Sequence, residues 1–166
     1  MYFEVREMCI MFILAIISTL LNVLIPMKEL VPLPGPAAGM AIFGGFTFVF
    51  WIVLSYKLIK KKFAGIVTSL LVASFCLLIS PWYGVTTPVW FSIYGILSLL
   101  AIGIFSELKS FVGGGIGNLA CLLITWTALA IHTGTSNYSP VLAILAFISG
   151  CIGHVLADLI SKFIKI

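Results

Sequence analysis

Six long apolar segments alternate with short segments that contain charge, proline or glycine along this chain. Each apolar segment approaches the roughly 20 residues that a helix needs to cross a bilayer. Continuous runs such as FGGFTFVFWIVLSY lack the two-residue alternation of a membrane β-barrel strand. The pattern predicts an all-α integral membrane protein, a compact bundle of six transmembrane helices forming a single domain over residues 1–166. The predicted spans are residues 8–25, 38–56, 63–80, 88–106, 114–132 and 140–163.

The composition supports a location in the cell membrane. Hydrophobic residues make up 62% of the chain and charged residues 8%, and the mean hydropathy is +1.27. A soluble domain carries about 25% charged residues because its surface faces water. Water-soluble enzymes and disordered tails are therefore excluded. The four cysteines lie inside apolar runs and lack the spacing of a disulfide framework or a metal site.

The basic residues predict the orientation, because short cytoplasmic loops carry an excess of Lys and Arg. Eight of the nine fall on the side that holds both termini, and only Lys28 falls on the other side. The eight are Arg6, Lys57, Lys60, Lys61, Lys62, Lys109, Lys162 and Lys165. Both termini are therefore predicted to be cytoplasmic. The KLIKKK run then serves as an anchor that can also contact anionic lipid, and no nucleic-acid partner is expected.

The three outer connections are nearly uncharged and contain proline and aromatic residues: MKELVPLPGPAAG, PWYGVTT and TGTSNYS. The first contains three prolines and follows directly on Pro26. These four prolines stiffen a connection that is long for so small a protein, as lids and binding loops often are. Two interpretations remain open for the aromatic side chains on this side. They form an interfacial belt, or they line a pocket for a flat, weakly charged ligand. The candidate ligand-binding residues are Glu29, Trp82, Tyr83, Trp90, Tyr94, Trp126, His132, Asn137 and Tyr138.

Small and polar residues share one face of the first span, where Ala15, Ser18, Thr19 and Asn22 follow helical spacing. The last span has a similar glycine-rich face. Such faces pack helices within a bundle, or they dock a partner membrane protein. In the last span, His154 and Asp158 stand one helical turn apart and are predicted to hydrogen-bond. They form either a local pair or a proton-coupling site.

No catalytic, metal or cofactor site is predicted. His132 and His154 are expected to differ in membrane depth by roughly 15–20 Å, too far apart for one zinc ion. The sequence contains no HExxH or GxSxG motif, and the GGGIG segment lacks the GK[ST] of a phosphate-binding loop. The protein is therefore not expected to be an enzyme.

Three stretches carry a resemblance to a known family: VREMCIMFILAIISTLLNVL, FVFWIVLSYKLIKKKFAGIVTSLLVASF and SGCIGHVLADLISK. With the six-span layout, they resemble the substrate-binding S-components of energy-coupling factor (ECF) transporters. The resemblance is closest to the branch linked to thiamin and its hydroxymethylpyrimidine precursor. The fourth span departs from that branch because it ends with Glu107 in place of a richer acidic cluster, and His154 and Asp158 have no counterpart.

The resemblance implies a division of labour among subunits. This chain would capture a small vitamin-like ligand at the outer face, under the long first loop. A separate transmembrane coupling subunit and two cytoplasmic ATPase subunits would supply the energy. Ala15, Ser18 and Thr19 match the positions that contact the coupling subunit in that family. Two alternatives remain: a structural or assembly subunit without a small-molecule ligand, and a stand-alone proton-coupled carrier that uses His154 and Asp158.

Overall fold

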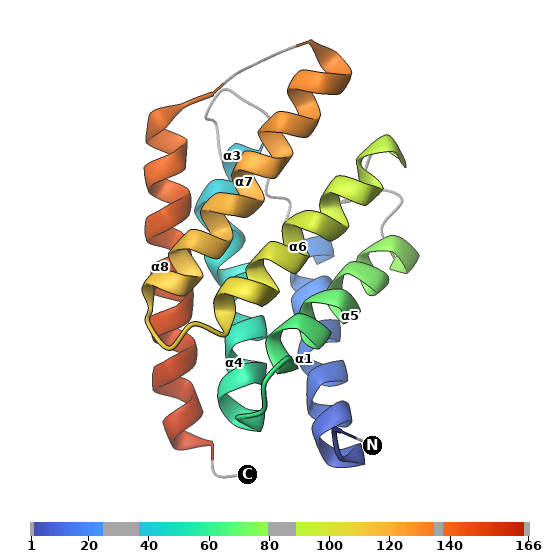
Figure 1. Cartoon of the computed structure of the whole chain (residues 1–166), viewed down its shortest axis with the longest axis vertical. Coiled ribbons are helices and arrows are strands. Elements are labelled where there is room, and N and C mark those ends of the chain that lie inside the picture. Colours follow the sequence, from blue (N-terminus) through green and yellow to red (C-terminus); the bar gives the residue numbers. More distant parts are fainter. Residues whose placement is uncertain (1, 25–36, 80–88, 135–137, 165–166) are drawn as a thin grey trace.

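The computed structural model describes residues 2–24, 37–79, 89–134 and 138–164. Within these ranges the chain is helical and contains no strand, which confirms the predicted all-α class. The helices form an elongated bundle with both ends of the chain at the same end of the molecule (Figure 1). In the described part of the chain, five helical spans are long and apolar enough to cross a membrane, and a sixth apolar helix is shorter.

The first half of the chain contributes three of these spans. Helix α1 covers Val5–Leu24 and begins three residues before the predicted span. The second span is one continuous helix built from α3 (Ala38–Gly44), the π-helical turn η1 (Gly45–Val49) and α4 (Phe50–Ile59). Helix α5 covers Ala64–Ile79.

The second half contributes the other three spans. A short 3₁₀ turn, η2 (Val89–Phe91), leads into α6 (Ser92–Ser106). Helix α7 covers Val112–Thr133, and α8 covers Pro140–Phe163, the same range that the sequence predicts. Helix α8 begins with Ser139 as its N-cap and Pro140 in its first turn, a combination favoured at helix starts.

The core is held by close backbone approach and by hydroxyl hydrogen bonds, as expected where lipid gives no hydrophobic drive between helices. Helix α7 packs most extensively against α8 and α6, which lie on either side of it (Figure 1). The hydroxyls of Ser55 and Thr68 pair at 2.7 Å between α4 and α5, and both side chains are fully buried. The amide of Asn118 donates to the Ala146 carbonyl at 2.8 Å between α7 and α8.

The π-helical turn was not predicted from the hydropathy pattern. Its i→i+5 hydrogen bonding leaves some carbonyl groups without their usual α-helical partner. The Ser18 hydroxyl on α1 donates to one of these turn carbonyls, that of Thr47, at 2.6 Å. Ser18 of α1 therefore faces this turn.

Candidate ligand-binding site

Three of the predicted aromatic residues meet at the end of the bundle where α6 begins and α7 ends. The rings of Trp90 and His132 stack with centroids 4.3 Å apart and an interplanar angle of 23°. The Tyr94 ring meets His132 edge-on at 5.6 Å, and the Tyr94 hydroxyl lies 3.3 Å from His132 Nε2. This aromatic cluster lies at the opposite end of the bundle from the two chain ends (Figure 1).

The local fold explains why these side chains meet. Trp90 and Tyr94 are four residues apart where η2 continues into α6, so they project from nearly the same face. Helices α6 and α7 are joined by residues 107–111 and run antiparallel, which brings the last turn of α7 beside the first turn of α6. His132 lies in that last turn.

The aromatic cluster can bind a flat ring by stacking. Trp90 and Tyr94 are half-buried and pack against the main hydrophobic core, which fixes their rings. His132 is exposed and covers one side of the indole. Stacked rings contribute about 0.5–1.5 kcal/mol beyond the area they bury, and the imidazole and phenol add hydrogen-bonding atoms.

A second aromatic pair lies between the end of α7 and the start of α8. Trp126 and Tyr138 meet edge-on with centroids 5.5 Å apart. Trp126 is 4% exposed, and its indole N–H is buried without a hydrogen-bond partner among the described residues. An unpaired buried donor costs about 1–3 kcal/mol, so a ligand acceptor at this position would relieve that cost.

The remaining predicted site residues are Glu29, Trp82, Tyr83 and Asn137, and they lie outside the described residues. Within the described part of the chain, no ring contact links the Trp126–Tyr138 pair to the Trp90–Tyr94–His132 cluster. The structure therefore brings five predicted residues into two separate groups at the same region of α7.

The comparisons with known proteins identify the fold. No protein-family description and no curated protein matches the sequence. A crystal structure of an S-component of an ECF transporter is similar, with a TM-score of 0.62 and 23% sequence identity, covering 97% of this chain and 83% of that one. The chain has the S-component fold. At this level of identity the likeness concerns the fold alone.

In this S-component fold the small-residue face of α1 points inward. Ala15, Ser18 and Thr19, predicted to contact a coupling subunit, are each 0% exposed. The Ser18 hydroxyl donates a hydrogen bond to the Thr47 carbonyl, and the Thr19 hydroxyl donates to the Ala15 carbonyl at 2.9 Å. The three side chains are occupied by internal packing, so the docking face predicted for them does not lie at the surface of this structure. The outward face of α1 carries large apolar side chains, those of Phe12, Ile13, Leu20 and Leu24.

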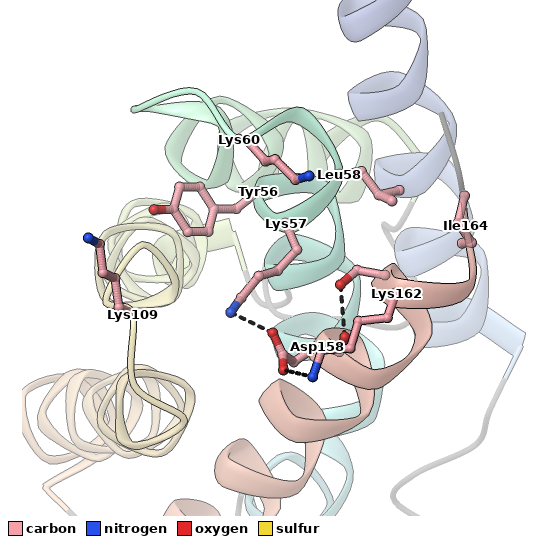
Figure 2. Close-up of a pocket in the computed structure, with 9 residues that line it drawn as sticks. Tyr56, Lys57, Leu58, Lys60, Lys109, Asp158, Lys162 and Ile164 are labelled. Carbon is pink, nitrogen blue, oxygen red and sulfur yellow. Dashed lines mark hydrogen bonds and ion pairs between the residues drawn. The ribbon is translucent and has the colours of Figure 1, made fainter.

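The predicted hydrogen bond between His154 and Asp158 is wrong. Asp158 pairs instead with Lys57 of α4 at 2.8 Å and with Lys162 of α8 at 3.1 Å (Figure 2). His154 is 1% exposed, and neither ring nitrogen has a hydrogen-bond partner among the described residues. Ammonium groups bind a carboxylate more strongly than a neutral imidazole does, so the two lysines take both Asp158 oxygens.

Proposed function

We propose that this protein is the membrane-embedded substrate-capture subunit of an ATP-driven ECF uptake transporter. The observation that carries the proposal is the contact of Trp90, Tyr94 and His132 at one end of a chain with the S-component fold. The lysine-rich connections lie at the other end, where the chain termini lie. By the positive-inside rule, the aromatic end then faces the outside, where a transported nutrient is first met.

The proposed ligand is a flat, neutral or weakly charged vitamin-type molecule, thiamin or its hydroxymethylpyrimidine precursor. Its ring would stack at the Trp90–His132 pair, because π-faces favour offset stacking with a second ring. The unpaired Trp126 N–H would donate to a ligand acceptor. Glu29, Trp82, Tyr83 and Asn137 remain proposed members of the site, contributed by the outer connections.

Transport energy would come from other subunits. The 166 residues contain no GK[ST] phosphate-binding motif, so ATP hydrolysis is assigned to two cytoplasmic ATPase subunits joined through a transmembrane coupling subunit. Since Ala15, Ser18 and Thr19 are buried, the proposed coupling contact uses the outward apolar face of α1. No cofactor is required for capture alone.

Ligand-dependent thermal unfolding of the purified full chain tests the proposal. Thiamin, hydroxymethylpyrimidine and a panel of other vitamins are titrated, and one of them is expected to raise the melting temperature saturably. A ligand present at about 100 times its Kd stabilises the folded state by about 2.7 kcal/mol. Replacing Trp90 by Leu is expected to weaken binding about tenfold, the loss of one stacking ring.

Trp51 provides the matched control, because its only ring contact within the described chain is with Phe50 in α4. Trp51→Leu removes an indole of the same size and is expected to leave the Kd unchanged. A flat response to the whole panel would favour the structural or assembly subunit. Uptake by the isolated chain in liposomes under a pH gradient, abolished by Asp158→Asn, would favour the proton-coupled carrier.

A further inference from the structure

A cavity of about 610 Å³ opens at the end of the bundle that carries the chain termini. It lies between the last turns of α4 and α8 and the connection from α6 to α7 (Figure 2). Four lysines line it, together with one carboxylate and a tyrosine: Lys57, Lys60, Lys109, Lys162, Asp158 and Tyr56. They come from three separate parts of the chain, residues 56–60, 109 and 158–162, which only the fold brings together.

The cavity carries an excess of positive charge. Among the described residues that line it, Asp158 is the single acidic one, and its two oxygens pair with Lys57 and Lys162. Lys60 and Lys109 are exposed and form no ion pair with the residues that the structure describes. Four ammonium groups and one carboxylate give the described lining residues a net charge of +3. Such a concave, basic surface favours a phosphate-bearing anion.

Apolar side chains adjoin the lysines. Leu58 and Ile164 line the same cavity. Ile164, the residue that follows α8, is 40% exposed. A free inorganic anion gains nothing from contact with these apolar side chains. A phospholipid can contact the lysines with its phosphate and the apolar side chains with its acyl chains. Basic pockets between transmembrane helices at the cytoplasmic side bind anionic headgroups in other membrane proteins.

We infer that this cavity binds the phosphate of one anionic phospholipid, with Lys60 and Lys109 as the main cationic contacts. The acyl chains lie along the apolar end of α8. Tyr56 carries a hydroxyl that can donate a hydrogen bond to a phosphate oxygen. The bound lipid joins α4 to α8 and to the α6–α7 connection. This site is at the opposite end of the bundle from the proposed vitamin site, and its test does not depend on that proposal.

The test compares the full chain in vesicles of phosphatidylcholine alone with the full chain in phosphatidylcholine mixed with phosphatidylglycerol. Lipids retained on the protein are counted by native mass spectrometry, and the melting temperature is recorded in parallel. One phosphatidylglycerol per chain is expected to be retained, with a higher melting temperature. A lysine near an anionic surface contributes about fivefold in affinity, so removing two is expected to weaken retention about 25-fold.

The variants are chosen so that they fold. Lys60 has a φ of 57°, a left-handed conformation that Asn tolerates, so Lys60→Asn removes the charge without backbone strain. It is combined with Lys109→Gln. Lys62→Gln is the matched control: it removes the same charge from the α4–α5 connection, but Lys62 does not line the cavity and lies over the Phe63 ring.

Three results would overturn the inference. Equal retention of phosphatidylcholine and phosphatidylglycerol would show that the cavity does not select anionic lipid. An equal loss of lipid with Lys62→Gln and with the double variant would indicate general surface charge in place of a site. Equal stabilisation by inorganic phosphate in phosphatidylcholine vesicles, abolished by the double variant, would assign the cavity to a soluble anion.

Discussion

At the scale of single residues, Glu107 joins the end of α6 to the start of α5. Its Oε2 accepts a hydrogen bond from the Phe63 N–H at 3.0 Å, and Oε1 accepts from Gly65 at 3.1 Å and from Ile66 at 3.5 Å. The first N–H groups of a helix lack partners within the helix and carry a partial positive charge. One carboxylate from a distant part of the sequence therefore caps α5.

Replacing Glu107 by Ala is expected to lower the free energy of unfolding by about 1–2 kcal/mol, the usual cost of a lost charged cap. Glu107→Gln keeps one acceptor and is expected to cost less. Thermal unfolding in detergent or nanodiscs measures both. Leu108→Ala, at the neighbouring half-exposed position, is the control. Equal stability of the Ala and Gln variants would contradict the capping role.

The residue scale also shows the limit of the sequence pattern. Helical spacing allows His154 and Asp158 to pair, but it gives no information on Lys57, which lies 101 residues before Asp158 and forms the shorter ion pair. The lysines of the basic cavity are separated in the same way. The cap at α5 could not be predicted either, because Glu107 and Gly65 meet only through the packing of α5 on α6.

At the scale of helices, α7 and α8 cross with their backbones in contact. A Cβ added at Gly150 would clash with the Gly114 carbonyl oxygen and lie 2.8 Å from the Asn118 Cβ. A Cβ added at Gly114 would lie 2.7 Å from the His154 Cβ. Backbone atoms cannot move aside as a flexible side chain can. The glycines therefore fix the distance between the two helices.

The variant Gly150→Ala is expected to destabilise the protein by about 1–3 kcal/mol, the usual cost of overpacking a rigid site. Ile148→Val changes one methyl group on the exposed side of the same helix and is expected to change stability by much less. Melting temperatures measured in the same nanodiscs compare the two. An unchanged melting temperature for Gly150→Ala would show that the helices separate without cost.

The helices themselves were largely predictable, because a bilayer requires long apolar segments in which each backbone group is paired within a helix. Whether the small-residue face of α1 points into the bundle or toward a partner could not be predicted from the sequence. Internal packing and partner docking select the same small residues, so Ala15 and Ser18 have the same appearance in either case. The meeting of Trp90 with His132 follows from the antiparallel order of α6 and α7, whereas their stacking depends on rotamers that the pattern does not specify.

At the scale of the whole molecule, the two ends of the bundle differ in chemistry. One end carries the basic cavity and the ion pair of Lys61 with Glu7 at 2.8 Å. The other carries the stacked aromatic cluster. Large apolar side chains are exposed along α1, α6 and α8, which suits contact with lipid tails. This asymmetry is the basis for the proposed orientation, with both termini in the cytoplasm.

Cysteine labelling of intact cells tests the orientation, after Cys9 and Cys151, the two native cysteines that are not buried, are replaced by Ser. Val89→Cys lies at the start of η2 and is expected to react with a membrane-impermeant maleimide. Lys62→Cys lies in the α4–α5 connection and is expected to react only after the membrane is permeabilised. Val89 is 90% exposed and Lys62 is also exposed, so a reagent on the correct side of the membrane can reach each position. The reverse labelling pattern would invert the topology and place the aromatic cluster inside the cell.

The π-helical turn at Gly45–Val49 has a consequence for changes in chain length. An i→i+5 turn holds one residue more than an α-helical turn, so removing one residue there would convert the span to regular α-helix. The residues of α3 and α4 that now point into the bundle would still point into it. Phe46, which is 47% exposed, is the residue whose loss disturbs the core least. A deletion of Phe46 is therefore expected to yield folded protein in membranes. A deletion in the middle of α7 would turn the rest of that helix by about 100° and abolish folding.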